Sequence, residues 1–271
     1  MSAETLAEWL SCPVCSEPLE AVSERVLGCA RGHRFDLNKR GYVTLLDPRS
    51  HVVGDSASML DARDRVLERG TYAPIAQALD RTVGAAGLSR ILDAGAGTGY
   101  YLRSLLATRP HARGLAMDLS PAAVARAVRK MDTVDGLVAD TWRPLPIRDS
   151  IADVIVNVFA PRNLTEFHRV LDPNGVLVVV VPRAEHLHEL RERGRMLDVP
   201  ADKAATLVES ARSLFTLERT VELVFELPDD EDLADSLVAM GPSAHHAHEA
   251  AEDTTSSSVT AAVDVLAFRP L

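Results

Sequence analysis

The sequence predicts an α/β protein in which a mostly parallel, Rossmann-like sheet follows a small metal-binding module. Three observations support this prediction. From residue 90 onward, short apolar segments alternate with helical patterns, which is typical of βαβ units. The first of these apolar segments runs directly into a turn with a glycine at every second position. All three cysteines lie within the first 29 residues, and His33 follows them closely.

The size of the chain fits one large domain and a small one, because 271 residues with almost half of them apolar can bury a sizeable core. We expect three parts. Residues 1–50 form the small metal-binding module, residues 51–88 a helical linker, and residues 89–271 the main α/β domain.

The N-terminal cysteines have the spacing of a structural zinc site. The pattern C-x2-C-x13-C-x3-H supplies the ligands Cys12, Cys15, Cys29 and His33. Three thiolates and one imidazole complete a tetrahedral, closed coordination sphere, so we expect a structural metal and not a catalytic one. A strand over 22–27 would make this module a zinc-stapled hairpin, and the metal would supply its folding energy. Unbound buried thiols and a redox pair are the alternatives.

The middle and C-terminal parts are predicted element by element. Amphipathic helices are expected over 57–68 and from Pro74 to about residue 83, separated by Gly70 and Tyr72. Predicted strands cover 90–93, 112–118, 136–139, 152–159, 176–181, 215–227 and 259–268. Predicted helices cover 99–107, 121–131, 163–171, 185–213 and 229–240, with a turn over 173–175 and a low-complexity loop over 249–258. The last two strands fit an antiparallel pair.

The glycine turn is the element most informative about function. Glycine tolerates unusual φ/ψ angles and lets a ligand lie against the backbone, beside the free N–H groups of the next helix. The sequence Asp93-x-Gly95-x-Gly97-x-Gly99 resembles motif I of the class I S-adenosylmethionine (SAM) methyltransferases. An ordinary βα turn is the plain alternative, and a dinucleotide oxidoreductase is disfavoured because its third glycine is spaced differently.

Several acids follow the predicted strands at positions suited to SAM. Asp118 ends the second strand, where a carboxylate accepts both ribose hydroxyls, although it could also simply cap the next helix. Asp140 follows the third strand and is a candidate for the adenine amino group. Asp93 would orient the glycine turn through backbone N–H groups, and Tyr72 is a candidate lid over SAM.

Larger segments resemble the family of 23S rRNA (guanine-N1-)-methyltransferases. The resemblance rests on the zinc pattern with Phe35-Asp36 and Gly41-Tyr42-Val43, and on three further segments: 54–56, Gly99-Tyr100-Tyr101 and 158–161 with His186-Leu187. Residues 240–244 resemble the Gram-positive branch that includes the tylosin-resistance methyltransferase. The likeness spans nearly the whole chain. It implies SAM contacts at Tyr72, Gly99, Tyr100 and His186, zinc at the four N-terminal ligands, a homodimer, and as substrate a guanine in a hairpin loop of domain II of 23S rRNA.

Methylation at guanine N1 requires an unpaired or flipped base, because N1 lies on the Watson–Crick edge and carries a proton that must leave. The pocket is expected beyond the strand ends, near residues 157–161. No catalytic residue is assigned. Asp55, Asn157 and His245 are candidate bases worth mutating.

The charge distribution and composition bear on partners and compartment. The net charge of −10 disfavours nucleic acid, but the acids concentrate after residue 218 while residues 25–49 are basic, with Arg34, Lys39 and Arg40 as exposed candidates. We expect a cytoplasmic protein that binds RNA, with no membrane or DNA partner. A small-molecule SAM methyltransferase and a non-catalytic zinc RNA-binding protein remain alternatives. Macrolide resistance is a hypothesis about the biological role.

Overall fold

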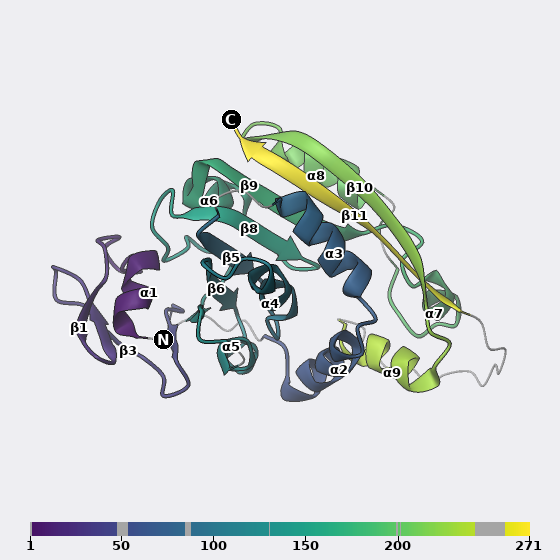
Figure 1. The fold of residues 1–271 in the computed structure, drawn as a ribbon, viewed down its shortest axis with the longest axis horizontal. Coiled ribbons are helices and arrows are strands. Elements are labelled where there is room, and N and C mark those ends of the chain that lie inside the picture. Colours follow the sequence, from purple (N-terminus) through teal and green to yellow (C-terminus); the bar gives the residue numbers. More distant parts are fainter. Residues whose placement is uncertain are drawn as a thin grey trace.

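The computed structural model describes residues 2–47, 54–84, 88–129, 131–198, 200, 202–241 and 258–271. It is a three-layer α/β/α structure with a small module at one end (Figure 1). The candidate base His245 and all but the last residue of the predicted loop over 249–258 lie outside the described residues. The described helices include none that is long and apolar enough to cross a membrane.

The main sheet contains all seven predicted strands. These are β5 (Arg90–Ala94), β6 (Arg113–Asp118), β7 (Val134–Val138), β8 (Ala152–Val158), β9 (Leu171–Pro182), β10 (Phe215–Leu227) and β11 (Val259–Pro270). Their order is β10-β11-β9-β8-β5-β6-β7, and β11 runs antiparallel to both of its neighbours. The order reverses at β5, which pairs with β6 on one side and β8 on the other. A parallel sheet binds ligands at such a reversal.

An eighth strand joins this sheet from the N-terminal segment. β4 (Tyr42–Thr44) pairs in parallel with β7 and extends the main sheet beyond the seven predicted strands. The main sheet therefore includes three residues that we had assigned to the first of the three predicted parts. The apolar side chains of Tyr42 and Val43 explain this, because both are buried against the main domain.

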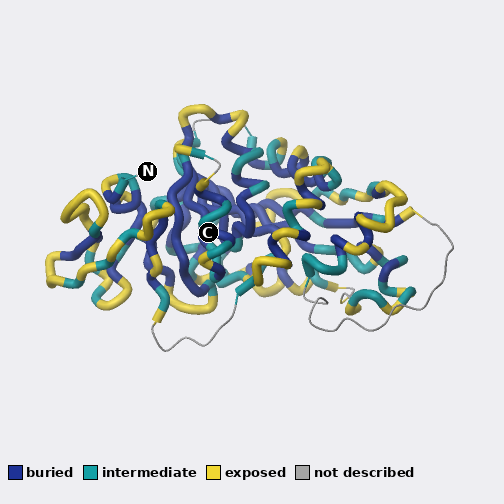
Figure 2. The backbone as a smooth tube through the Cα atoms, turned by 90° about the horizontal axis from the view of Figure 1, so that it is seen from below, coloured by how far each residue is buried: buried dark blue, intermediate teal, exposed yellow. Residues whose placement is uncertain are grey.

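Both faces of the sheet are covered by helices, since neighbouring strand residues such as Ile91 and Leu92 point into opposite cores. One core includes α2 (Ala57–Glu68), α3 (Ala73–Val83), α4 (Tyr100–Ala107), α5 (Pro121–Arg129), α7 (His188–Glu192) and α9 (Glu231–Ala239). The other includes α1 (Ala3–Trp9), α6 (Leu164–Val170) and α8 (Lys203–Ala211). Figure 2 shows the buried residues concentrated in the sheet, whereas the turns of the terminal module are exposed.

Two predicted elements differ in the structure. The single helix over 185–213 is two helices, α7 and α8, separated at Gly194, whose φ is +70°. The predicted turn over 173–175 is part of β9, where it forms an irregularity: Ala152 pairs with Leu171 and Val154 with Val176. The extra residues on β9 leave Pro173 and Asn174 exposed.

The N-terminal module has its own three-stranded sheet of β1 (Glu20–Ser23), β2 (Val26–Gly28) and β3 (Arg34–Asp36). Our single strand over 22–27 was wrong, because the chain turns between Ser23 and Val26 and makes a hairpin there. Helix α1 was not predicted, although Ser2 and Thr5 form a capping box at its start.

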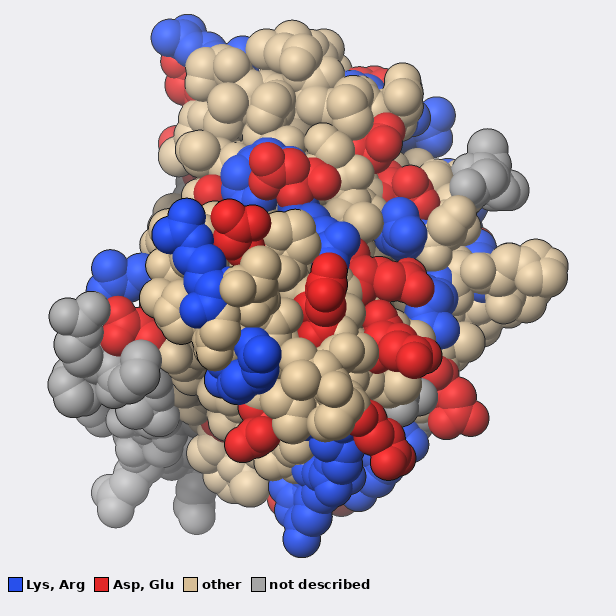
Figure 3. Space-filling model, turned by 90° about the vertical axis from the view of Figure 1, so that its left-hand side faces the viewer, with Lys and Arg blue, Asp and Glu red and all other residues tan. Residues whose placement is uncertain are grey.

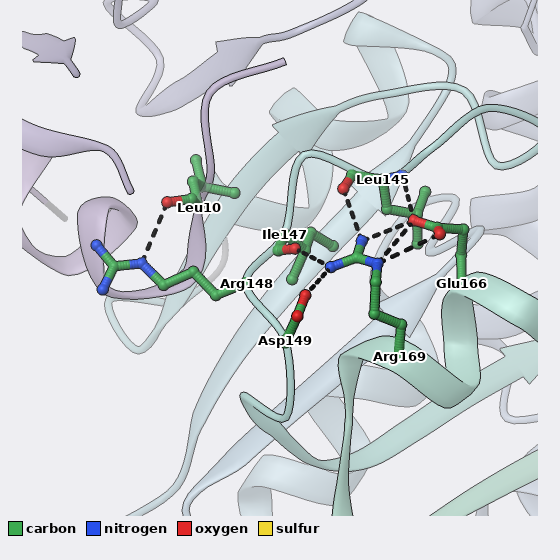
Figure 4. A network of polar contacts seen from close by, with 7 residues as sticks. All are labelled: Leu10, Leu145, Ile147, Arg148, Asp149, Glu166 and Arg169. Atoms are coloured by element: carbon green, nitrogen blue, oxygen red, sulfur yellow. Dashed lines mark hydrogen bonds and ion pairs between the residues drawn. The ribbon is translucent and has the colours of Figure 1, made fainter. Parts of the chain in front are cut away.

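The module is fixed to the main domain by a loop that follows β7 (Figure 4). The Arg148 guanidinium donates to the carbonyl of Leu10 (3.2 Å) and to that of Leu19 (2.8 Å). Arg169 on α6 orders the loop from the other side. It donates to the carbonyls of Leu145 and Ile147 and pairs with Asp149 and Glu166.

Candidate active site and metal centre

The four N-terminal ligands converge as the sequence predicted. All of their donor atoms lie within 4.8 Å of one another. His33 Nδ1 lies 3.5 Å from the Sγ atoms of Cys12 and Cys15 and 3.3 Å from that of Cys29, and Cys15 Sγ lies 3.6 Å from Cys29 Sγ. A tetrahedral Zn²⁺ with ordinary bond lengths separates two sulfurs by about 3.8 Å and a sulfur and a nitrogen by about 3.6 Å. The donor set therefore fits zinc in both chemistry and spacing.

Two tight turns bring these ligands together. In the first, the Ser16 N–H donates to the Cys12 carbonyl (2.8 Å), with Ser16 at φ +60°. In the second, the Gly32 N–H donates to the Cys29 carbonyl (3.0 Å), with Gly32 at φ +88°. The donors come from these turns and no water position is implied among four protein ligands, so the site is of the structural kind.

The glycine turn lies between β5 and α4 at the reversal of strand order. Gly95, Gly97 and Gly99 all have positive φ, of +88°, +52° and +77°. A Cβ atom on Gly95 would lie 2.3 Å from Ala160 Cβ, and one on Gly99 would lie 2.8 Å from Ala127 Cβ. Glycine is thus required both for the backbone conformation and for close packing against α5 and against the loop after β8 (residues 159–163, called the β8 loop).

Asp118 at the end of β6 braces this turn. Its Oδ2 atom accepts from the Gly97 N–H (2.9 Å), and its Oδ1 atom accepts from the Ser120 N–H (2.9 Å). Burial raises the pKa of Asp118. Ser120 caps α5, since its Oγ accepts from the Ala123 N–H at 3.4 Å. The structure therefore places the Asp118 carboxylate, the candidate for the ribose hydroxyls, against the glycine turn.

Asp93 is almost completely buried, at 2% exposed. Burial raises the pKa of Asp93 to about 7, and the Asp118 carboxylate adds to the shift. The Asp93 carboxyl group makes a hydrogen-bond contact with the backbone of Leu102 in α4. We had expected this carboxyl group to orient the glycine turn. Its Oδ2 atom has no hydrogen-bond partner.

Unpartnered polar atoms gather around the glycine turn. Among the described residues, the buried side-chain atoms without a hydrogen-bond partner include five in this region: Tyr72 Oη, Asp93 Oδ2, Thr98 Oγ1, Tyr101 Oη and Asn157 Oδ1. Buried polar groups are normally hydrogen-bonded, so such a cluster indicates a site that a polar ligand completes. A ligand with a diol, an amino acid and a purine, such as SAM, fits this lining.

An aromatic cluster lies beside this polar lining. Tyr72, at the start of α3, is surrounded by Phe159, His186 and Phe225 at centroid distances of 6.2, 6.3 and 6.4 Å. Phe159 and His186 stack on each other at 5.5 Å. Phe159 has a φ of +52°, an uncommon conformation for a bulky residue and one of the kinds of strain that cluster at functional sites.

His186 is a neutral imidazole at neutral pH. Burial, together with the cations of Arg191 and Lys203, lowers its pKa to about 4. Its Nδ1 atom accepts from the Ala262 N–H (3.2 Å), so the ring proton lies on Nε2. This side chain is therefore a hydrogen-bond donor and an aromatic surface, and it is unsuited to accept a proton.

The candidate bases that the structure describes are engaged in other contacts. The amide of Asn157 donates to the carbonyls of Ala94 and Pro161, both at 2.8 Å, which fixes the β8 loop on β5. Asp55 is paired with Arg63, with 2.5 Å between Oδ2 and Nη1. Asp140, which was predicted to contact the adenine amino group and not to act as a base, accepts from the Trp142 N–H (3.0 Å), so its carboxylate is turned back onto its own loop.

Arg63 is the residue at this site that sequence reasoning missed. Its Nη1 atom lies 3.0 Å from the position that a Gly97 Cβ would occupy, and its Nη2 atom donates to the Met240 carbonyl (3.0 Å). A lone arginine on an amphipathic helix gives no sequence signal, because most such residues face solvent. Phe225 was also missed, because it has the pattern of an ordinary apolar strand residue, whereas Phe159 lies within the segment 157–161 where the pocket was expected.

The predicted basic surface is partly realised. Arg34, Lys39 and Arg40 are exposed, but the Arg34 guanidinium donates to the carbonyls of Cys29 (3.2 Å) and His33 (3.0 Å) and so supports the metal-binding turn. Figure 3 shows that Lys and Arg side chains on this end of the molecule are interspersed with Asp and Glu. The basic run therefore does not form an uninterrupted patch.

The fold and the site together define a class I SAM-dependent methyltransferase with an N-terminal zinc ribbon. Residues 91–175 match the model of a methyltransferase domain, and residues 10–50 match the zinc ribbon described as RlmA, N-terminal. Among solved structures, a methyltransferase from Bacillus halodurans has a TM-score of 0.53 at 18% identity, covering 72% of this chain and 97% of that one. A SAM-dependent methyltransferase from Aquifex aeolicus has a TM-score of 0.50 at 17% identity, covering 76% and 97%.

Two relatives are similar over nearly the full length. A protein of Micromonospora griseorubida described as a 23S rRNA (guanine-N(1)-)-methyltransferase is 41% identical over 97% of each chain. The 23S rRNA (guanine(748)-N(1))-methyltransferase of Streptomyces fradiae is 37% identical over 99% of each chain. This chain belongs to the 23S rRNA (guanine-N1-)-methyltransferase family, and the predicted family, fold class, SAM and structural zinc are confirmed.

Proposed function

We propose that this protein methylates N1 of a guanine in a hairpin loop of domain II of 23S rRNA, near the peptide exit tunnel, in the cytoplasm. The observation that carries the proposal is the near-complete similarity to two such enzymes in a chain that keeps both the zinc donors and the glycine turn. S-adenosylmethionine supplies an electrophilic methyl group when it is bound.

The cofactor would be held by residues on both sides of the glycine turn. The Asp118 carboxylate has lone pairs left for the ribose hydroxyls after its two backbone contacts, and the region of Gly95, Gly97 and Gly99 allows close backbone approach. Tyr72, Tyr100 and His186 would border it, with Asp140 near the adenine and Asp93 facing a cationic group. The buried unpartnered atoms listed above support this assignment.

Arg63 would bind the carboxylate of the amino-acid end. Its guanidinium lies against Gly97 and already makes a carboxylate pair with Asp55, so it is held in a position from which a second carboxylate can be bound. Arginine presents a planar fork of donors that matches carboxylate geometry. Asp55 then positions Arg63, which is a more natural use of this acid than as a free base.

The target guanine would enter beside the β8 loop, where Phe159 and His186 offer a stacked aromatic surface. Methyl transfer depends mainly on alignment, and the Asn157 contacts to β5 and to the loop hold this surface in place relative to the glycine turn. Residues 1–50 would recognise RNA with Lys39 and Arg40, residues 51–88 would cover the cofactor, residues 89–271 would carry out transfer, and two chains would form a homodimer.

The test is methylation of protein-free 23S rRNA with labelled SAM, followed by reverse transcription, which stops at a guanine blocked on its Watson–Crick edge. We expect label and a single stop in a domain II hairpin loop, and neither with Asp118→Ala. A stop at another base type, or no label in RNA, would refute the proposal.

Label in a small molecule would favour the small-molecule alternative, and the absence of SAM binding by calorimetry would favour a non-catalytic RNA-binding protein. The resistance hypothesis is tested separately, by comparing macrolide susceptibility of a host with and without the wild-type gene.

A further inference from the structure

A groove beside the β8 loop is not explained by the cofactor site or by the zinc module. It has a volume of about 830 Å³ and lies between the loops after β7 and β8 and helix α8. Its polar and aromatic lining includes Trp142, Arg162, Asn163, Lys203, Thr206 and Ser210. These residues come from three separate segments of the chain, which the fold brings to one opening.

Trp142 is the most unusual residue of this lining. Its exposed fraction is 65%, and it is one of two tryptophans in the chain, whereas Trp9 is buried at 1%. The Asp140 carboxylate accepts from its backbone N–H (3.0 Å), and the Arg143 N–H donates to the Asp140 carbonyl (3.1 Å), so the loop that carries it is ordered. A large aromatic ring held in solvent indicates a partner with a flat face.

Two cations face the same groove without an acidic partner. Among the residues that the structure describes, neither Arg162 nor Lys203 makes an ion pair, although most other arginines do. Burial lowers the pKa of Arg162, and burial together with the Arg162 charge lowers the pKa of Lys203. Of the described residues that line the groove, Asp202 is the only acid, and it is an exposed residue that precedes α8. Two neighbouring unpaired cations are stabilised when an anion lies between them.

The groove adjoins the proposed methyl-transfer site. Arg162 directly follows Pro161, whose carbonyl accepts from Asn157, and Asn157 also binds the end of β5. The Lys203 charge acts on His186, which is part of the aromatic cluster. A strand that places one base at Phe159 and His186 would therefore continue into this groove.

We infer that the groove binds the single-stranded RNA next to the target guanine, with one base stacked on Trp142 and its phosphate between Arg162 and Lys203. This inference rests on the proposed function and adds the RNA contact nearest to the reaction. Single-stranded nucleic acids are bound by aromatic stacking combined with cations along the backbone, and the groove offers both. Its hydroxyl and amide groups, on Thr206, Ser210 and Asn163, can reach sugar or base edges.

The direct test uses tryptophan fluorescence, because Trp142 is the exposed one of the two tryptophans. A domain II stem-loop transcript of 23S rRNA should quench the emission of the wild-type protein on binding, and Trp142→Phe should abolish the quenching while it retains most of the RNA affinity. Trp142→Ala should raise the Kd for RNA about tenfold. Quenching that persists in Trp142→Phe would overturn the stacking contact.

The cations are tested by salt dependence. Arg162→Ala and Lys203→Ala should each weaken RNA binding several-fold, and each should reduce the slope of log K against log salt by about 0.7 for the lost phosphate contact. The matched control is Arg212→Ala, since Arg212 lies just after α8, is exposed and pairs with Glu209 (2.9 Å) outside the groove. The affinity for S-adenosylhomocysteine should stay the same in all of these variants.

The outcomes separate this inference from the proposed function. If the wild-type protein methylates 23S rRNA and the groove variants bind RNA with a Kd within twofold of the wild-type value, the groove inference alone is overturned. Wild-type protein that neither binds nor methylates the transcript would overturn both. Quenching by guanosine monophosphate to the same extent and at the same concentration as by the transcript would show a mononucleotide site and would contradict an RNA-strand site.

Discussion

The substitution Gly95→Ala tests whether the glycine turn is built by close packing against the β8 loop. The new Cβ would lie 2.3 Å from Ala160 Cβ, a distance that real Cβ atoms do not reach, and Gly95 has a φ of +88°. A left-handed conformation costs a non-glycine residue roughly 1–2 kcal/mol. Overpacking adds typically 1–3 kcal/mol. We therefore expect the free energy of unfolding to fall by roughly 2–5 kcal/mol.

Two further variants separate these contributions. Gly70→Ala has a similar φ of +74° with nothing within 4 Å of its Cβ, so it should show the conformational cost alone. Ala160→Gly removes the clashing methyl, and the nearest remaining atom, Ala160 Cα, is 3.7 Å away, an ordinary contact. The double variant Gly95→Ala/Ala160→Gly should therefore recover about 1–3 kcal/mol relative to the sum of the single variants.

The assay is urea unfolding of the wild type and the four variants, with calorimetry of S-adenosylhomocysteine binding in parallel. Affinity should fall in Gly95→Ala, because the turn must shift away from Ala160, and it should recover in the double variant. The packing argument would be refuted if Gly95→Ala lowered the free energy of unfolding no more than Gly70→Ala does. It would also be refuted if the double variant recovered none of the lost free energy.

Three other predictions concern separate parts of the molecule. Arg63→Ala should weaken S-adenosylhomocysteine binding at least tenfold but leave methylthioadenosine, which lacks the amino-acid end, nearly unaffected in calorimetry; equal losses would contradict the carboxylate contact. Asp93 has a folded pKa of about 7, above its unfolded value of about 3.8, so its contribution to stability is present at low pH and is lost as pH rises from about 4 to 7. Asp93→Asn has no carboxyl group to ionise, so between pH 4 and 7 its free energy of unfolding in urea should rise by a few kcal/mol relative to that of the wild type. Parallel pH profiles of the two proteins would show that Asp93 is not buried as a neutral acid. Cys29→Ser should reduce zinc content and RNA methylation by more than tenfold, while the affinity for S-adenosylhomocysteine stays within about threefold of the wild-type value. Loss of cofactor binding in this variant would show that the zinc ribbon and the pocket are not independent.

The main elements of the fold could be predicted because local patterns determine them. Ser56 and Asp230 cap α2 and α9 through their side chains, and the apolar run of β9 is buried on both faces. The partner of β4 could not be predicted, because three residues carry no information about which sheet edge they join. The hairpin in 20–28 was missed because its turn, Glu24-Arg25, contains neither glycine nor proline.

The candidate site divides in the same way. Spacing alone identified the zinc ligands and the glycine turn, since each set lies within one short stretch of the sequence. The contact of the Asp93 carboxylate with the backbone of Leu102 in α4 has no signal in the sequence around the glycine turn. Arg63, Phe225 and Trp142 lie far apart in sequence and are brought to the site and its adjoining groove only by the fold. No local pattern therefore distinguishes them from ordinary helix, strand or loop residues.

The position of the zinc ribbon has a mechanical consequence for RNA recognition. The ribbon is held to the main domain by the Leu10–Ile147 bridge, the Arg148 contacts and the β4–β7 pairing, and Thr5 on α1 donates to the fully buried Asp135 of β7 (2.7 Å). Asp135 is also paired with Arg113 at 3.1 Å. These contacts do not involve the metal ligands, so loss of zinc should loosen β1–β3 while α1 and β4 stay in place. Under the proposed function, the ribbon would therefore hold its RNA contacts at a fixed distance from the glycine turn. This distance would determine which guanine reaches the loop after β8.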